Sequence, residues 1–326
     1  MLLRQIEETI NEKDQVIIFQ NRRGYSPMIN CEDCGWIPKC TNCAVSLTYH
    51  QFRHALVCHY CGYKEQLPSN CPVCSSARIR TVGYGTEKLE EELKLHFENA
   101  HIQRMDLDTT RTKSGYETII DQFEKGETNI LVGTQMVTKG LDFDRVSLVG
   151  VFNADRMMHF PDFRSYERAY QLITQVSGRA GRRDKPGKVV IQTSDPENPI
   201  LKFILKNNYH DFFQTQITDR KEHAYPPFSR LIEIIIKHID KKQASQTAYQ
   251  LADEFRSKLG SAKIIGPGEP VISKIRNQYL MTILIKVSRN NHELLLLKSQ
   301  IQNMVTELQK DKTHRNARII VDVDPV

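Results

Sequence analysis

The sequence predicts an α/β protein in which a largely parallel sheet carries an inserted two-zinc ribbon module. An α+β domain with a ferredoxin-like order follows. Three observations support this fold class. Short apolar strands alternate with amphipathic helices before residue 222, and eight cysteines, all in C-x-x-C pairs, lie between Cys31 and Cys74. After residue 222 the order becomes β-α-β-β-α-β, which is typical of ferredoxin-like domains.

The composition restricts the class of protein. The 326 residues are 40% hydrophobic and 26% charged, as in globular proteins. The longest apolar runs, such as Leu231–Ile236, are strand-sized and fall short of the roughly 20 residues that cross a bilayer, so no membrane partner is expected. No signal peptide precedes the cysteines, and we expect a cytoplasmic protein. A net charge of +6 permits nucleic-acid binding without establishing it.

The first part of the chain reads as alternating strands and helices. Gln15–Gln20 is a continuous apolar run, as expected for a parallel strand covered on both faces. Ligands of such sheets meet the loops at the carboxyl ends of the strands. The further strands predicted are Arg80–Gly83, Ile102–Asp106, Asn129–Gly133, Val146–Phe152 and Lys188–Gln192. The helices predicted are Met1–Asn11, Thr86–Glu98 with Thr86 as its cap, Gly115–Glu124 and Ser165–Ala180.

The pattern changes at the segment EHAYPP, so we place a domain boundary near residue 222. The strands predicted after it are Leu231–His238, Ile264–Ile265, Val271–Ile275, Tyr279–Val287 and Ala317–Val323. The helices are Lys242–Leu259 and His292–Gln309. The predicted domains are therefore residues 1–30 with 78–221, the insert 31–77, and residues 222–326.

The cysteine pairs predict metal binding, because two C-x-x-C turns supply the four sulfurs of a tetrahedral zinc site. Their spacing favours a nested arrangement, in which an inner ribbon is closed by an outer set, although consecutive or interleaved pairing stays open. The inner set is Cys40, Cys43, Cys58 and Cys61, and the outer set is Cys31, Cys34, Cys71 and Cys74. Chelation is then expected to unfold residues 31–74 and to leave the flanking lobe folded.

The cysteines and the neighbouring histidines also allow other interpretations. Disulfides and a redox role are weaker alternatives for C-x-x-C pairs in an intracellular protein. Because four pairs already complete two sites, His50, His54 and His59 are interpreted as surface or packing residues. The sequence therefore predicts two structural zinc ions and leaves no cysteine for catalysis.

Two further motifs point to phosphate chemistry. Gln175, Arg179 and Arg182 form a Q-x-x-G-R-x-G-R motif, whose two arginines would share one helical face and fork onto phosphate oxygens. Thr134 and Lys139 follow the strand Asn129–Val132 and offer a hydroxyl and an amine to a phosphodiester. The structural alternatives are a solvated basic helix end for the arginines and an ordinary polar loop for Thr134 and Lys139.

These motifs resemble the second RecA-like lobe of superfamily-two helicases, and most closely the PriA family of primosomal replication-restart helicases. The likeness covers essentially the whole chain in the family's order. It is carried by NRRG (Asn21–Gly24), the cysteine pairs, GYGTEKLEEEL (Gly83–Leu93), DLDTT (Asp106–Thr110), GTQMVTKGLDF (Gly133–Phe143), DFRSYER (Asp162–Arg168), TQVSGRAGR (Thr174–Arg182), YPPFSR (Tyr225–Arg230) and DVDP (Asp322–Pro325).

The resemblance implies roles for particular residues. Gln175, Arg179 and Arg182 match the motif whose arginines face the ATP γ-phosphate. Gly140 and Asp142 match the junction between nucleotide and DNA, and Thr134 matches a DNA-contacting hydroxyl. The eight cysteines match the family's two zinc sites, which help strand separation and primosome assembly. The resemblance also implies DNA forks, single-stranded DNA, single-stranded-DNA-binding protein, other primosome proteins and a replicative-helicase loader as partners.

One departure from the family pattern limits the expected activity. The sequence contains neither a G-x-x-x-x-G-K-[ST] loop nor an acidic DEAH-like box to hold Mg²⁺. The family's first RecA-like lobe would precede Met1, so we expect ATP and Mg²⁺ to bind only together with that lobe. The prediction is the C-terminal portion of a 3′-to-5′ DNA helicase that restarts stalled forks and is inactive alone. The alternative is a non-enzymatic zinc-stapled module that binds DNA or protein.

Overall fold

The computed structural model describes most of the chain and divides it into two compact units. The described residues are 1–21, 28–41, 45–50, 55–82, 86–106, 109–110, 112–138, 143–181, 186–259 and 262–325. The first unit is Met1–Trp36 with Ser69–Tyr209, and the second is Ile37–Pro68 with His210–Val326. The cysteine-rich insert is thus shared between the units. The predicted boundaries at residues 31, 77 and 222 were placed where the sequence pattern changes along the chain, and they stay a prediction.

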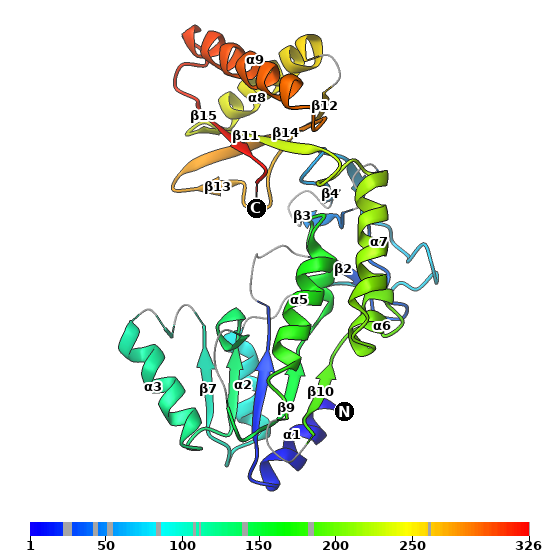
Figure 1. The fold of residues 1–326 in the computed structure, drawn as a ribbon, viewed down its shortest axis with the longest axis vertical. Helices are drawn as coiled ribbons and strands as arrows, with labels where there is room; N and C mark the ends of the chain where they lie inside the picture. The colour runs from blue at the N-terminus through cyan, green and yellow to red at the C-terminus, as the bar shows by residue number, and fades with distance from the viewer. Residues whose placement is uncertain are drawn as a thin grey trace. The chain divides into compact units, whose positions relative to one another are not determined.

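The first unit is built on a parallel sheet with the order β10-β9-β1-β8-β7, which confirms the predicted α/β class. Figure 1 shows the strands side by side with helices alongside. The strands are β1 (Gln15–Phe19), β7 (Ile102–Met105), β8 (Ile130–Gly133), β9 (Val146–Val151) and β10 (Lys188–Ile191).

The central strand β1 is buried along its whole length, as its apolar sequence predicts. Val16 lies opposite Ile130 on one side and Leu148 on the other. Its one polar residue, Gln15, is also buried, and its side-chain amide donates to the carbonyl oxygens of Phe123 at 2.6 Å and Thr128 at 2.7 Å. A buried amide is tolerated here because both of its donor hydrogens are bonded.

Helices surround this sheet, and three of them were not predicted. They are α1 (Leu2–Asn11), α2 (Thr86–His96), α3 (Lys113–Glu124), α4 (Asp155–Met158), α5 (Ser165–Ser177) and α6 (Pro199–Leu205), followed in the chain by α7 (Tyr209–Glu222). Helix α5 ends three residues earlier than predicted, and α4, α6 and α7 were not predicted. Thr86 opens α2, but its hydroxyl donates to the Asp106 carboxylate at 2.8 Å.

A separate two-stranded ribbon closes the base of the insert within the first unit. Strand β2 (Met28–Cys31) pairs antiparallel with β6 (Ile79–Val82), so that Cys31 lies opposite Ile79. The sequence placed this second strand in the alternating series of the main sheet, and that placement is wrong. The ribbon instead brings the start and the end of the cysteine-rich insert together.

The second unit contains the predicted ferredoxin-like domain. Its antiparallel sheet has the order β12-β14-β11-β15, with β13 paired to β14 (Figure 1). Helices α8 and α9 supply a buried core against the sheet, including Phe255 and Ile301. The elements are β11 (Arg230–His238), α8 (Lys241–Lys258), β12 (Lys263–Gly268), β13 (Lys274–Ile275), β14 (Gln278–Val287), α9 (Asn291–Lys310) and β15 (Arg318–Val323).

The inner part of the insert also belongs to the second unit. It forms a three-stranded antiparallel sheet of β3 (Thr48–His50), β4 (Ala55–Val57) and β5 (Lys64–Gln66). A bridge between Lys39 and Ser46 precedes it. Among the described residues, every helix is too short or too polar to cross a membrane.

Candidate functional site

The outer cysteines converge in the first unit. The sulfur atoms of Cys31, Cys34, Cys71 and Cys74 all lie within 4.8 Å of one another. Cys31 and Cys74 are 3.6 Å apart, and Cys34 and Cys71 are 3.5 Å apart. A disulfide requires about 2.05 Å, whereas sulfurs around a tetrahedral zinc with 2.3 Å bonds lie about 3.8 Å apart. These four thiols therefore fit a single tetrahedral metal ion.

The two outer C-x-x-C turns have the same backbone design. The residue after the second cysteine donates its N–H to the carbonyl of the first, at 2.9 Å for Gly35 and 2.8 Å for Ser75. This residue has a positive φ, 72° at Gly35 and 60° at Ser75, a conformation that favours glycine. A backbone N–H also points at sulfur, at 3.5 Å from Val73 to Cys71. Such bonds favour the thiolate, which is the metal-binding form.

The inner cysteines converge in the second unit. Cys40, Cys58 and Cys61 have their sulfurs within 4.8 Å of one another, and Cys40 lies 3.6 Å from Cys61. The third turn repeats the design, with Gly62 at φ 75° donating to the Cys58 carbonyl at 3.0 Å. Cys43, the fourth predicted ligand, lies outside the described residues. The grouping of the described thiols is the nested one, not the consecutive or interleaved one.

The outer thiols hold their protons unevenly. The Trp36 backbone N–H lowers the pKa of Cys34, but burial and hydrogen bonds with three neighbouring thiols outweigh it and raise that pKa to about 12. For Cys31, burial raises the pKa of the thiol, but hydrogen bonds from Cys34 and Cys74 outweigh burial and leave the pKa lowered. Crowded thiolates repel one another, so a bound cation is what would allow all four to ionise.

His59 lies inside the third turn and packs against the C-terminal domain. It is 5% exposed, and its Nδ1 is hydrogen-bonded to the carbonyl oxygen of Glu269. The backbones are in close contact, because a methyl group on Gly62 would lie 3.1 Å from the Pro267 carbonyl oxygen. Likewise, one on Gly266 would lie 3.4 Å from the carbonyl oxygen of Tyr60. The His54 residue and the His50 side chain lie outside the described part.

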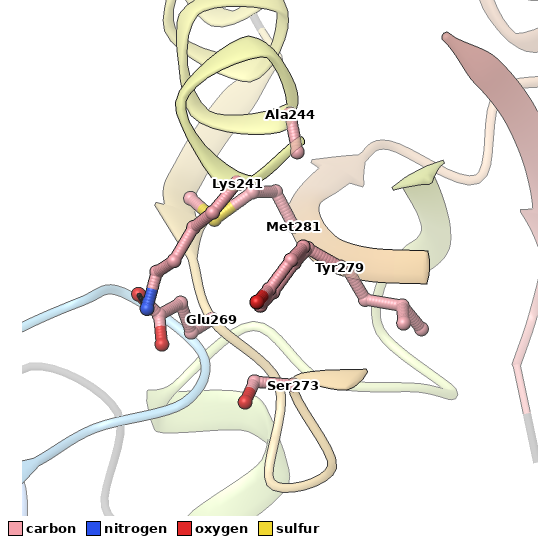
Figure 2. A pocket seen from close by; sticks show the side chains of 7 residues that line it. Lys241, Ala244, Glu269, Ser273, Tyr279 and Met281 are labelled. Carbon is pink, nitrogen blue, oxygen red and sulfur yellow. Dashed lines mark ion pairs between the residues drawn. The ribbon is translucent and has the colours of Figure 1, made fainter. Parts of the chain in front are cut away.

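Glu269 also forms the rim of a small hollow at the start of α8 (Figure 2). The Lys241 ammonium lies 3.0 Å from the Glu269 carboxylate. Figure 2 shows Tyr279 and Ser273 beside this pair, and Ala244 and Met281 also line the hollow. The segment around Glu269 is therefore held from two sides, by the zinc-ribbon turn through its carbonyl and by α8 through its carboxylate.

Thr134 lies at the carboxyl edge of the parallel sheet, directly after β8. Its N–H donates to the carbonyl of Met105 at 3.3 Å, and its side chain is half-buried. Asp106 follows the neighbouring strand β7 and is 1% exposed, with its carboxylate accepting from the Thr109 N–H at 3.1 Å. Polar residues therefore gather at this edge, as the rule for parallel sheets predicts.

Gly133 is required for this turn, and its substitution is a direct test. A methyl group there would lie 2.1 Å from Val137 Cγ1, which is fully buried, and 3.1 Å from the Met105 carbonyl. We expect Gly133→Ala to destabilise the first unit by about 1–3 kcal/mol, because an overpacked core must shift. Gly178→Ala is the matched control, since its methyl would meet only ordinary contacts at 3.6 Å and beyond. Urea unfolding would measure the free energy of unfolding of both variants. Equal losses of stability would contradict the requirement for glycine at position 133.

The arginine motif lies at the opposite edge of the sheet. Helix α5 ends at Ser177, so Arg179 stands on the turn after it, and the predicted helical face for the two arginines is wrong at this position. Gly181 donates to the carbonyl of Val146, the first residue of β9, at 3.1 Å. Gln175 is exposed and Arg179 is half-buried. The structure therefore does not bring Arg179 and Thr134 together.

Several predicted site residues cannot be placed. Lys139, Gly140, Asp142 and Arg182 lie outside the described residues, as does Cys43. Their assignments rest on sequence alone and stay predictions. Sequence reasoning in turn missed the contact between the third cysteine turn and Glu269. The glycines of Gly266-Pro267-Gly268 are a signal of close backbone approach that could have indicated it.

Three family models match the chain. Residues 221–326 match the primosomal protein N C-terminal domain. Residues 40–66 match the cysteine-rich region domain of PriA DNA helicase, and residues 67–184 match the helicase conserved C-terminal domain. The three matches together span residues 40–184 and 221–326 and fall in both compact units.

Curated relatives named replication restart protein PriA are similar over nearly the same span. The Bacillus subtilis protein is 40% identical over 99% of this chain and 40% of its own length. The Haemophilus influenzae protein is 38% identical over 99% of this chain and 44% of its own. The Synechocystis protein is 40% identical over 84% and 34%. The chain thus spans about two fifths of the length of these relatives.

Proposed function

The chain belongs to the PriA family of replication restart proteins, and we propose that it supplies part of an ATP-dependent 3′-to-5′ DNA helicase. Its contribution is the second RecA-like lobe, a two-zinc ribbon and a C-terminal domain. The observation that best supports this is the combination of a parallel α/β lobe with nested thiol clusters inserted after its central strand. A zinc-stapled binding module without enzymatic function is not favoured, since it leaves the helicase C-terminal match unexplained.

In this proposal the two edges of the parallel sheet have different tasks. Thr134 and Lys139, after β8, hold the phosphodiester backbone of DNA at the carboxyl edge. Gln175, Arg179 and Arg182, with Gly140 and Asp142, face a nucleotide that another lobe binds through its own phosphate loop and Mg²⁺. Arginine beside a γ-phosphate stabilises the charge that develops during its transfer. The separation of Arg179 from Thr134 supports such a division of tasks.

Two structural zinc ions are proposed for the insert, one for each thiol cluster. Cys31, Cys34, Cys71 and Cys74 would hold the first, and Cys40, Cys43, Cys58 and Cys61 the second. Each would fix the geometry of its two C-x-x-C turns and contribute to folding, without taking part in the chemistry. The insert, made rigid by the two zinc ions, would act as a wedge that separates the DNA strands.

The partners proposed are forked and single-stranded DNA, single-stranded-DNA-binding protein, other primosome proteins and a replicative-helicase loader. The setting proposed is the cytoplasm. A net charge of +6 agrees with a nucleic-acid partner. Phosphate contacts should make DNA binding weaken steeply with rising salt.

A complementation experiment tests the proposal. The 326-residue chain alone is expected to bind zinc and DNA but not to hydrolyse ATP. Adding a polypeptide that carries a family member's first RecA-like lobe is expected to give DNA-dependent ATP hydrolysis. DNA-binding titrations and phosphate-release assays measure the two properties. DNA binding without any restored hydrolysis would support the non-enzymatic module instead.

A further inference from the structure

The segment of residues 193–195 follows β10 at the carboxyl edge of the parallel sheet and is in contact with the first outer C-x-x-C turn. A methyl group on Gly35, the residue after that turn's second cysteine, would lie 3.0 Å from the Ser194 carbonyl oxygen and 3.2 Å from Asp195 Cβ. Asn30, the residue before its first cysteine, donates its side-chain amide to the Ser194 hydroxyl at 3.4 Å. The outer thiol cluster therefore rests on the 193–195 segment at both ends of this turn.

Asp155, at the start of α4, holds the 193–195 segment in place. Its carboxylate accepts hydrogen bonds from the Thr193 hydroxyl at 2.7 Å and from the Ser194 N–H at 2.8 Å. The residue is 6% exposed, so both bonds are shielded from water. Hydrogen bonds to a charged acceptor are about twice as strong as neutral ones. One buried carboxylate thus fixes a side chain and the backbone of the segment that carries the outer thiols.

Further hydrogen bonds join the 193–195 segment to the elements around it. The Gln192 N–H donates to the Val151 carbonyl at 2.9 Å, which continues the ladder between β9 and β10. The Ala154 N–H, directly before α4, donates to the Gln192 carbonyl at 2.9 Å. The Asn198 amide, at the start of α6, donates to the Asp195 carboxylate at 3.2 Å. The segment is consequently bonded to the sheet and to two helices.

We propose that Asp155 is a positioning residue that couples the outer thiol cluster to the parallel sheet, so that motion of the sheet is transmitted to the zinc insert. This inference rests on the proposed function, in which the insert separates DNA strands. Asp155 touches neither nucleotide nor DNA in this role. It acts through the Ser194 N–H, whose residue is in contact with the backbone of the outer turn.

The course of β9 supports this role. At its amino end the Val146 carbonyl accepts from Gly181, in the turn that carries Arg179. At its carboxyl end the strand leads within four residues to Asp155, which holds the support of the outer thiols. Thr134 stands at the same carboxyl edge, after the neighbouring β8. One strand therefore connects the edge assigned to the nucleotide with the edge assigned to DNA and the outer zinc ion.

Hydrogen exchange on the 326-residue chain alone tests the contact. In Asp155→Ala two buried donors lose their acceptor, so we expect amide exchange in residues 28–36 to become at least about tenfold faster. Exchange in β1 and β8, and the zinc content of the chain, are expected not to change. Faster exchange throughout the lobe would assign Asp155 a general role in stability and overturn the proposal. Unchanged exchange in residues 28–36, or loss of zinc, would overturn it as well.

Strand separation tests the coupling, in the sample complemented with a first RecA-like lobe. Asp155→Ala is expected to keep ATP hydrolysis within about threefold of the unaltered chain and to lower strand separation per ATP at least about tenfold. Asp155→Asn should restore most of the coupling, because its amide can donate to the Thr193 hydroxyl and its oxygen can accept from Ser194. Asp121→Ala, which breaks an exposed ion pair with Lys125 on α3, is the matched control and should change neither property.

Hydrolysis and strand separation that fall together in Asp155→Ala would overturn the coupling role. If that variant does not fold, Thr193→Val removes one of the two hydrogen bonds at nearly constant volume and is expected to show the same split to a smaller degree. A complemented sample that does not hydrolyse ATP would overturn the proposed function instead. The exchange measurement, which needs no second lobe, then decides the role of Asp155.

Discussion

Substituting Cys58 by serine is expected to loosen the C-terminal domain, whereas substituting Cys71 by serine is expected to leave it intact. The reason is that the turn around Cys58 packs directly on the segment Gly266–Glu269 of the same unit. Zinc contributes roughly 10–16 kcal/mol to the folding of small zinc modules, so losing it removes the order of the turn. The support beneath Glu269 is then lost.

Hydrogen exchange resolves this prediction by region. For Cys58→Ser we expect lost protection in Lys263–Gly268, the strand that carries the contacted glycines, and a melting temperature of the second unit lower by about 10 °C or more. For Cys71→Ser we expect lost protection near the β2–β6 ribbon instead. Zinc content, measured by mass spectrometry, should fall by one ion per chain in either variant.

The outcome also decides between two views of the insert. The sequence predicts one module, residues 31–74, that unfolds on chelation while its surroundings stay folded. The packing of the chain divides that module between two compact units. If Cys58→Ser disorders the insert alone and β12 keeps its protection, the view of an independent module is correct.

Replacing Arg179 or Arg182 by alanine is expected to reduce ATP turnover roughly 10³-fold or more in the complemented assay, the scale of arginine effects in phosphoryl transfer. The loss should appear in kcat, since the arginine acts on charge that develops during the reaction. Zinc content and DNA binding by the chain alone should not change. Arg179→Lys should rescue little, because an ammonium lacks the guanidinium fork.

A surface substitution provides the control for the arginine experiment. Lys94 forms an exposed helical ion pair with Glu90 at 2.8 Å, a type of contact that contributes little to stability. Lys94→Ala should therefore leave ATP turnover near that of the unaltered chain. Turnover that survives both arginine substitutions would remove the basis for assigning a nucleotide-facing role to this motif.

The sequence predicted the elements whose burial pattern is strong. The mostly apolar β1 and the alternating strands of the C-terminal domain were predicted within a few residues of their observed bounds. Helix α6 was missed although Asn198 caps it by accepting from the Ile200 N–H at 3.3 Å, and Pro199 opens it. In helix α7 the one buried residue is Phe212. Its sequence therefore lacks a clear helical periodicity of apolar residues, which is why the helix was not predicted.

The candidate site was predictable only in part. The spacing of the cysteines indicates which thiols share a metal site, because the four C-x-x-C turns can be paired in only a few ways. The contact between His59 and Glu269 joins residues 210 positions apart in the chain. Local sequence patterns do not predict a contact over that separation. The end of α5 was also misjudged, because Arg and Ala are good helix formers, whereas the bond from Gly181 to the Val146 carbonyl just after the helix is a tertiary contact.

Strands β8 and β9 are neighbours of β1 on its two sides and run in the same direction. The peptide that leaves Thr134 must consequently travel back down the full height of the sheet before it can enter Val146, whose carbonyl holds the arginine turn through Gly181. Under the proposed roles, a displacement that a nucleotide phosphate imposes beside the arginine turn is expected to reach the DNA-facing edge of the sheet through this connecting peptide.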